Sequence, residues 1–201
     1  MREPSSQRLE TRRRIVDAAD ALFRERGIDG VGVDAIMRAA GMTHGGFYFH
    51  FPSKEALVAA VSAEQLARSA ARWSDTADRH PQAEALDRVV TNYLHDRNIE
   101  PSNYGCVLPA LGPELARRPE SRTAVTEAIR QMLAALTRML PFRSRARAEK
   151  AAMATLSTLV GAVVLARLSS DPVLSGAILQ AAREQVLPRR NTRPSAGADL
   201  C

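Results

Sequence analysis

The chain contains few aromatic residues and few cysteines. Aromatic residues make up 4% of its 201 residues, and the two cysteines, Cys106 and Cys201, are distant from each other in the sequence. Two such thiols form neither a disulfide framework nor a zinc site of clustered cysteines. The four histidines also lack the spacing of metal ligands alongside cysteine or carboxylate, so we expect no metal and no cofactor.

Long apolar stretches are also scarce. No segment shows the roughly 18 consecutive apolar residues that a membrane span requires, and the charged segment 1–14 is not followed by the apolar core of a signal peptide. An enzyme would need a catalytic constellation, yet no Ser/His/Asp set, no glycine-rich phosphate loop after a strand and no metal-binding spacing occurs. We therefore expect a cytoplasmic protein without catalytic activity and without a membrane partner.

Positive charge, in contrast, is in excess. The formal net charge is +6 and the isoelectric point is about 10.1, which favours an anionic partner such as DNA. In residues 1–55, however, nine Lys or Arg residues face eight Asp or Glu, and much of the excess lies in 138–150 and 189–193. Charge alone therefore does not locate a binding surface.

Apolar residues recur three and four positions apart along most of the chain, as in helices that bury one face, and the alternation typical of strands is nearly absent. Gly27 and Gly41 are suited to end the first two helices, Thr43 to cap the third and Ser53 to cap the long fourth helix. The predicted fold is all-α, with about nine helices. The first helix centres on 15–23, and the others span 33–40, 43–51, 53–79, 82–96, 106–117, 120–140, 144–168 and 172–187.

Two of the short predicted helices are joined at a glycine. This is the layout of a helix-turn-helix, although the same layout also occurs in many helical bundles. The residues themselves are more specific, because the run GIDGVGVDAIMRAAGMTHGGFYFHFPSKEAL, residues 27–57, closely resembles the DNA-binding signature of the TetR family of repressors. The match includes the Ala40-Gly41 turn and the block 47–55, and it extends over about residues 10–60. The remainder resembles the family only in its helical layout and length.

The resemblance implies a ligand-responsive DNA-binding transcriptional regulator, a repressor released from a palindromic operator by a small molecule. Its partners would be double-stranded operator DNA, an effector of unidentified structure and a second copy of the chain in a homodimer. The implied organisation is a three-helix helix-turn-helix domain at 1–52 and a helical ligand-binding and dimerisation domain at 53–187. Residues 188–201 have little hydrophobic content and are expected to form a disordered tail.

The resemblance also assigns DNA-facing positions. Elementary chemistry agrees with them, since a helix start favours a phosphate, glycine lets the backbone approach DNA closely, and tyrosine, histidine and lysine can donate hydrogen bonds to phosphate oxygens. The expected DNA-binding residues are Thr43, His44, Gly46, Tyr48, His50 and Lys54.

Several neighbouring residues allow more than one interpretation. Phe47 and Phe51 are expected in the core, whereas Phe49 could lie on either side. His50 could be a structural histidine instead of a DNA contact, and arginines 12–14 could form a solvated helix face or reach a flanking phosphate.

Two glycines depart from the family pattern. Gly32 stands where the family usually has Ser or Thr at the start of the second helix, and Gly46 replaces a residue that often contacts DNA with its side chain. Base readout would then depend more on Thr43 and His44.

The last two predicted helices are too apolar for a single buried face. Two adjacent helices that need burial on two faces predict a four-helix dimer interface, which is also how the family uses its last two helices. The alternative is a fully buried helix within a monomer. The expected interface residues are Leu156, Val160, Val164, Leu174, Ile178 and Ala181.

The middle helices supply the candidate effector pocket. Aromatic residues and methionines suit an apolar small molecule with a few polar groups, although such residues are also common core fillers. The expected ligand-binding residues are Trp73, Tyr93, Tyr104, Cys106, Met132 and Met139, with Phe142 nearby in sequence.

Cys106 carries a further hypothesis. It follows Gly105 at a predicted helix start, where the helix dipole would lower the pKa of the thiol, and some TetR-like repressors with a Gly-Cys pair at a similar place respond to electrophiles or oxidants. The alternatives to an ordinary ligand-responsive repressor are therefore a thiol-based sensor acting through Cys106 and a helical small-molecule-binding protein without DNA binding. A structural role of Cys106 in packing is also open.

Overall fold

The computed structural model describes residues 4–100 and 105–187. Within these ranges the chain forms eight α-helices and two short 3-10 helices and contains no strand, which confirms the all-α prediction. In chain order the elements are α1 (Pro4–Arg26), α2 (Val33–Ala39), η1 (His44–Phe49), α3 (Lys54–Arg79), α4 (Gln82–Tyr93), η2 (Asp96–Asn98), α5 (Val107–Ala116), α6 (Pro119–Met139), α7 (Arg145–Leu168) and α8 (Pro172–Val186).

Local signals account for most of the helix ends. Gly27 and Gly41 adopt the left-handed conformation, with φ of 73° and 70°; Gly27 directly follows α1, and Gly41 follows the C-cap Ala40 of α2. The Ser53 hydroxyl accepts a hydrogen bond from the Ala56 N–H at 3.0 Å and caps α3. The third helix is a 3-10 helix rather than an α-helix, and the helix expected at 82–96 ends at Tyr93.

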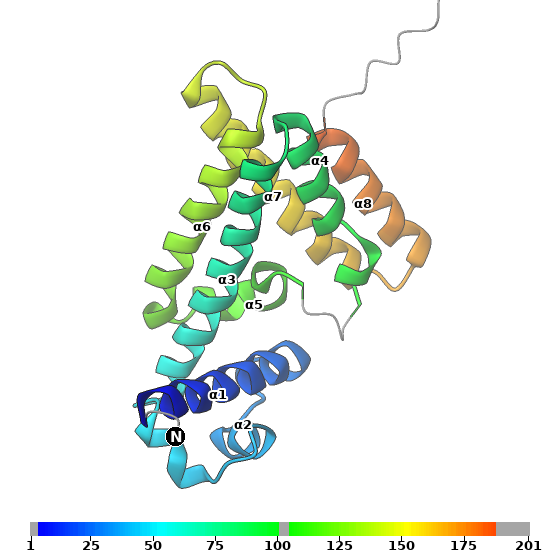
Figure 1. The fold of residues 1–201 in the computed structure, drawn as a ribbon. Helices are drawn as coiled ribbons and strands as arrows, with labels where there is room; N and C mark the ends of the chain where they lie inside the picture. The colour runs from blue at the N-terminus through cyan, green and yellow to red at the C-terminus, as the bar shows by residue number, and fades with distance from the viewer. Residues whose placement is uncertain (1–3, 101–104, 188–201) are drawn as a thin grey trace, which may run out of the picture.

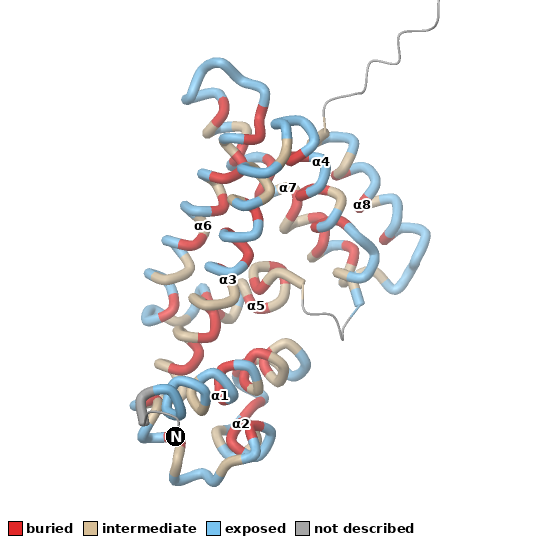
Figure 2. The backbone as a smooth tube through the Cα atoms, viewed as in Figure 1, coloured by how far each residue is buried: buried red, intermediate tan, exposed pale blue. Residues whose placement is uncertain are grey.

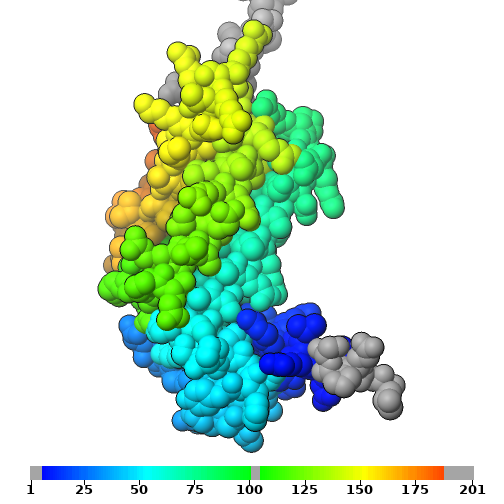
Figure 3. All heavy atoms as spheres, turned by 90° about the vertical axis from the view of Figure 1, so that its left-hand side faces the viewer, coloured from blue at the N-terminus to red at the C-terminus, as the bar shows by residue number. Residues whose placement is uncertain are grey.

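The elements form an elongated molecule (Figure 1). Helices α1 and α2 and the η1 segment form a head at one end, and the long helix α3 leaves this head and runs beside α6. Helices α4, α7 and α8 lie at the other end, and α5 lies between them and the head. Figure 3 shows α3 and α6 side by side along one face of the molecule. The helix α3 is therefore a continuous connection between the two ends.

Two hydrophobic clusters fill the interior (Figure 2). The first contains apolar residues of α1, α2 and η1 together with Leu57 and Leu66 of α3 and Leu111 and Leu115 of α5. The second contains the far end of α3 and the buried faces of α4, α6, α7 and α8. Packing therefore continues across the boundary expected at residue 52, because the first half of α3 belongs to the core of the head. The division into domains stays a prediction, and the tail at 188–201 lies outside the described residues.

The sequence was expected to contain no segment apolar enough to span a membrane, and helix α7 departs from that expectation. An 18-residue window of this helix has a mean hydropathy of 1.8, so α7 is long and apolar enough to cross a membrane by length and composition. Alanine, glycine, serine and threonine interrupt the large apolar residues and hide this property from a search for consecutive ones. Core helices of soluble proteins have the same composition, and α7 packs against α6 and α8.

Candidate DNA-binding face and effector pocket

The η1 segment is anchored by two buried phenylalanines. Phe47 and Phe51 are 0% and 2% exposed, and their ring centroids lie 5.9 Å apart. The guanidinium carbon of Arg12 lies 4.5 Å from the centroid of the Phe51 ring, a cation–π contact that ties α1 to this segment. The prediction that both phenylalanines belong to the core is confirmed.

The opposite side of η1 presents polar and aromatic side chains to solvent. Thr43, His44 and Tyr48 are exposed, and the Thr43 hydroxyl makes no capping hydrogen bond although Thr43 occupies the N-cap position. His44 Nδ1 lies 2.5 Å from a carboxylate oxygen of Asp34 on α2, which fixes the imidazole ring. Phe49 is 76% exposed, so it lies on the solvent side and not in the core.

Gly46 is partly exposed, and its surroundings differ from those of Gly45. A side chain at Gly46 would point at Met37, whose Cε lies 3.5 Å from the ideal Cβ position, and the Gly46 N–H donates to the Thr43 carbonyl oxygen at 3.1 Å. Gly45 is exposed and has open space around its Cβ position. The two glycines therefore have different surroundings on a tight 3-10 turn, and a close approach of the Gly46 backbone to DNA stays a prediction.

His50 and Lys54 flank the end of η1. The Nδ1 atom of His50 is buried without a hydrogen-bond partner, and burial together with the charges of Arg8 and Arg12 lowers the pKa of His50. His50 is thus a neutral imidazole near pH 7 in the free protein. Lys54 is the first residue of α3 and is partly exposed, so its ammonium group can reach a phosphate.

The arginines of α1 have separate structural roles. Arg14 is exposed, and it donates to the Ala40 carbonyl oxygen at 2.6 Å and so holds the end of α2. Arg13 forms an exposed pair with Asp17 at 3.6 Å. Arg8, which sequence reasoning missed, donates to the Phe49 carbonyl oxygen at 3.2 Å and places a further positive charge beside η1. Only its position one helical turn before Arg12 hints at this role.

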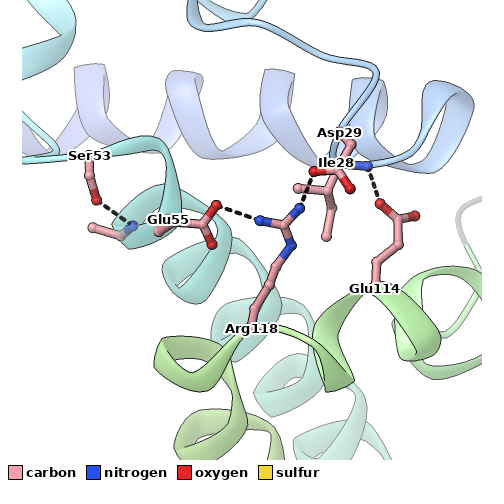
Figure 4. A network of polar contacts seen from close by, with 7 residues as sticks. Ile28, Asp29, Ser53, Glu55, Glu114 and Arg118 are labelled. Atoms are coloured by element: carbon pink, nitrogen blue, oxygen red, sulfur yellow. Dashed lines mark hydrogen bonds and ion pairs between the residues drawn. The ribbon is translucent and has the colours of Figure 1, made fainter.

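A network of polar contacts joins the head to the rest of the molecule (Figure 4). Arg118, at the start of α6, forms ion pairs with Glu55 in the first turn of α3 and with Asp29 in the α1–α2 connection. A carboxylate oxygen of Glu114 on α5 accepts a hydrogen bond from the Ile28 N–H at 2.7 Å. Burial opposes the charged form of Arg118, yet its hydrogen bonds with Glu55 and Asp29 outweigh burial and raise its pKa. These contacts hold the head against α5 and α6.

A hollow of about 960 Å³ lies between α3, α4 and the segment that follows α4. Trp73, Tyr93 and Cys106, three of the residues expected to bind a ligand, line it, and their role in binding stays a prediction. Met132 and Met139 do not line this hollow, because both are buried in the core cluster on α6. Phe142 is exposed after α6, and Tyr104 lies outside the described residues.

The wall of this hollow is more polar than expected. Alongside the aromatic rings it includes Arg72, Thr76 and Asn98, with Glu84 and Arg88 toward its outer part. The expectation of an apolar pocket lined by methionine is wrong, because the methionines turn toward the interior of the bundle while α3 and α4 present polar side chains to the hollow.

The environment of Cys106 also differs from the prediction. Burial raises the pKa of the thiol, and this outweighs the lowering by the Tyr93 hydroxyl, by a backbone hydrogen bond at Leu108 and by the charges of Arg24 and Arg72. The thiol is therefore protonated at neutral pH. The helix dipole at the start of α5 does not overcome desolvation.

The predicted interface residues divide into two groups. Leu156 is 6% exposed and lies in the core of the chain itself, so it offers almost no surface to a partner. Val160 and Ile178 are partly buried against that core. Val164 is partly exposed, and Leu174 and Ala181 are exposed. Sequence reasoning left out further exposed apolar residues on these helices: Met153, Leu165, Leu168 and Val173.

Comparison with known proteins shows which family the sequence of the head resembles. Residues 15–61 match the model of "Bacterial regulatory proteins, tetR family". The A-factor receptor protein of Streptomyces griseus is 44% identical over 57 residues, which cover 28% of this chain and 21% of that protein. The transcriptional regulator UidR of Escherichia coli strain K12 is 37% identical over 65 residues, which cover 32% of this chain and 33% of UidR. The match thus spans a third or less of the length of these two relatives.

The similarity of the fold extends much further along the chain. The crystal structure of a transcriptional regulator of the TetR family from Agrobacterium tumefaciens superposes with a TM-score of 0.74 at 21% identity, covering 90% of this chain and 100% of that one. The sequence match lies on the helix-turn-helix and the structural match includes the helices behind it. The helix-turn-helix segment of the chain belongs to the tetR family of bacterial regulatory proteins, and the chain as a whole has the fold of a TetR-family structure.

Proposed function

We propose that the chain is a DNA-binding transcriptional regulator that works as a homodimer and responds to a small molecule. The observation that carries this proposal is the solvent face of η1. Thr43, His44 and Tyr48 are exposed there, while Phe47 holds the segment from behind. This face lies inside the segment that matches the family model. Such a role requires the protein to share the cytoplasm with the chromosome.

The geometry of η1 suits the major groove. A short helix can enter a groove about 12 Å wide with its first residues at the base edges. Thr43 and the ring of His44, oriented by Asp34, occupy this leading position. Tyr48 and Lys54 then meet the phosphates on the flanks, where hydroxyl and ammonium groups position the protein without reading sequence.

The outer surface of α7 and α8 supports a homodimer. Leu168 and Val173 are 78% and 80% exposed, and they join Leu165 and Leu174 in an apolar patch at the α7–α8 turn. The Cβ positions of Gly161 and Gly176 face open space, which allows another helix to approach closely. The patch is of the kind that marks a protein interface, and a symmetric pair of such surfaces forms a four-helix contact. Val160, Val164, Ile178 and Ala181 lie on the same two helices.

The effector would act through α3. Trp73 lines the hollow, and Lys54 at the other end of the same helix belongs to the DNA face. Arg118 joins the first turn of α3 to α6, so movement of α6 relative to α3 displaces the head. A ligand that prefers the displaced arrangement weakens DNA binding. A coupling of about 1–3 kcal/mol corresponds to a 5–150-fold loss of affinity, and DNA weakens ligand binding by the same factor.

A covalent switch at Cys106 is less well supported than reversible binding. Its pKa is raised by burial, whereas a reactive cysteine needs a lowered pKa. A helical binding protein without DNA binding is disfavoured by the exposed polar face on η1.

Selection of bound fragments from the genomic DNA of the source organism tests the proposal. The selected fragment should then be titrated at several salt concentrations with the unmodified protein and with Lys54→Ala. We expect Lys54→Ala to weaken binding to all sequences and to reduce the slope of log K against log salt by about 0.9, the value of one phosphate contact.

Arg79→Ala is the matched control, since Arg79 is an exposed cation at the far end of the same helix. It should leave the affinity and the slope unchanged. If no fragment is enriched over random DNA, or if the two variants behave alike, the assigned DNA face is wrong.

A further inference from the structure

The hollow contains a buried polar group without a partner. The Tyr93 hydroxyl is buried and has no well-formed hydrogen bond among the described residues; its neighbour there is the Cys106 thiol. The side chain that it faces is the Cys106 thiol, which is only a weak hydrogen-bonding group. Burial raises the pKa of Tyr93 well above its ordinary value, so the hydroxyl keeps its proton and can act as a donor. Buried polar groups in proteins are rarely left unpaired, and those that are often mark a binding site.

Positive charge gathers around this hydroxyl without matching negative charge. Arg167 of α7 is half-buried, donates to the Asn98 carbonyl oxygen at 2.8 Å, and has no ion pair with any described carboxylate. Burial lowers its pKa, and its charge acts on both Tyr93 and Cys106. Arg72 of α3 lines the hollow and is exposed, and among the described residues its guanidinium donates to the Ser69 hydroxyl alone, at 2.9 Å.

A third guanidinium lies close by. Arg24 of α1 pairs with Asp20 at 2.8 Å and donates to the Gly105 carbonyl oxygen at 2.5 Å. The ideal Cβ position of Gly105 lies 3.3 Å from a terminal nitrogen of Arg167, so Gly105 separates these two cations. Asp20 is the one carboxylate that pairs with any of the three arginines in the described parts of the chain. Arg72, which is exposed and lines the hollow, and Arg167, which lies behind its lining, therefore carry positive charge near Tyr93 without a described carboxylate partner.

The outer end of the hollow has a different electrostatic character. Glu84 pairs there with Arg88 at 2.9 Å and with His80 at 3.2 Å, so its charge is balanced locally. Asp87 also lines the outer part and is exposed to solvent. The α4 side of the hollow therefore carries both acidic and basic side chains, whereas the side near Tyr93 carries the unpaired Arg72.

The inner end also offers an aromatic wall. The Trp73 and Tyr93 rings meet edge to face with their centroids 5.7 Å apart, and both are largely buried. Such a wall suits a flat apolar body, while the hydroxyl and the guanidinium groups suit an anionic oxygen.

We propose that this hollow binds an organic carboxylate with an aromatic or similarly flat apolar body. The carboxylate accepts hydrogen bonds from the Tyr93 hydroxyl and the Arg72 guanidinium and lies in the positive field of Arg167. The proposal deepens the proposed function, on which it rests, by naming the chemical class of the effector. It also connects the site to the head, because Arg24 on α1 holds Gly105 at the inner wall.

Trp73 is the single tryptophan of the chain, so its fluorescence reports on the site directly. The probes are 4-phenylbutanoate, its neutral amide and the cationic 4-phenylbutylamine, which share a phenylalkyl body and differ in charge. We expect the carboxylate to quench Trp73 fluorescence with an affinity at least about tenfold higher than that of the amide, because charge-assisted hydrogen bonds are stronger than neutral ones. The amine should bind most weakly.

Arg72→Gln and Tyr93→Phe should each remove most of this preference while they leave binding of the amide nearly unchanged. Arg79→Gln, on the same helix and outside the hollow, should leave the preference intact. Thermal unfolding of each variant checks that it remains folded.

The proposal is overturned if the amide or the amine binds as tightly as the carboxylate, if Arg72→Gln keeps the preference, or if none of the probes quenches Trp73 at about 10 mM, a concentration above the usual range of weak ligand affinities. Binding of the selected DNA fragment is measured separately and without probe. A protein that binds DNA and prefers the amide contradicts this inference alone, whereas one that prefers the carboxylate and binds no DNA contradicts the proposed function alone.

Discussion

Cys106 shows how two local effects compete at one residue. The start of α5 stabilises a thiolate through the helix dipole, whereas burial beside Tyr93 destabilises it. Burial is the larger effect, and it raises the pKa of the thiol. The free protein therefore holds a neutral thiol next to a neutral phenol. The guanidinium groups of Arg72 and Arg167 nearby are the groups that we propose bind a carboxylate.

Alkylation kinetics test this assignment. In a Cys201→Ser variant, Cys106 is the single remaining thiol, and its rate of reaction with iodoacetamide follows its thiolate fraction. Because the pKa is raised above its ordinary value, the thiolate fraction near neutral pH should be smaller than that of a free cysteine. We expect slow reaction at about pH 7.5 and a rate that still increases above about pH 9. A rate that reaches its plateau below about pH 8 would contradict a raised pKa and would restore the thiol-sensor hypothesis.

At the scale of helices, α3 runs from the head to the far end of the molecule, and the ion pairs of Arg118 at the start of α6 add a second link to the head. Arg118 is largely buried and forms ion pairs with Glu55 and with Asp29, which are more exposed. Solvent screens such pairs in part, so their contribution to stability is modest. Their importance lies in the position of Arg118 between α3 and the α1–α2 connection.

The substitution Arg118→Met removes both ion pairs and keeps much of the side-chain volume. We expect a loss of about 1 kcal/mol in the free energy of unfolding, or roughly 2–4 °C in Tm for a chain of this size. Affinity for the selected DNA fragment should fall as well, since the head becomes less fixed relative to α3. Arg117→Met is the control, because Arg117 is exposed and forms no ion pair with any described residue. Equal Tm values and DNA affinities for the two variants would show that the network does not hold the head.

The helices themselves could be predicted closely from the sequence. Their ends depend on neighbouring residues, and the signals at Gly27, Gly41 and Ser53 act within one turn. The core phenylalanines of η1 could also be predicted, because a short amphipathic segment has only one apolar side.

Features that depend on packing between distant segments could not be predicted in this way. The methionines of α6 are as apolar as pocket residues, and only the placement of α6 against α3 and α7 puts Met132 and Met139 in the core. The same holds for Arg118, whose two partners are 63 and 89 residues away in sequence. The direction of Gly46 depends on the tight turn of η1, which helical periodicity does not distinguish from an α-helix.

On the scale of the whole molecule, binding to a palindromic operator requires two copies of the chain. One head carries one short reading segment, and a palindromic operator has two half-sites about 34–36 Å apart. The exposed apolar residues of α7 and α8 lie outside the head, and the turn between these two helices is at the side of the molecule, so a dimer formed there leaves both heads free (Figure 1). Val164 is the most suitable residue for disrupting this contact, since it is partly exposed and, unlike Val160 and Ile178, does not pack against the core cluster.

The most direct measurement is a titration of the selected operator fragment in its original form and with about five base pairs, half a helical turn, inserted between its half-sites. We expect two protomers on the original fragment and loss of tight binding on the lengthened one, because the two heads can no longer meet the same face of the DNA. Val164→Asp should be monomeric by sedimentation and should bind the original fragment as weakly as the unmodified dimer binds the lengthened one. Equal affinity for both fragments, or one protomer per fragment at saturation, would contradict a dimer that reads DNA with two η1 segments.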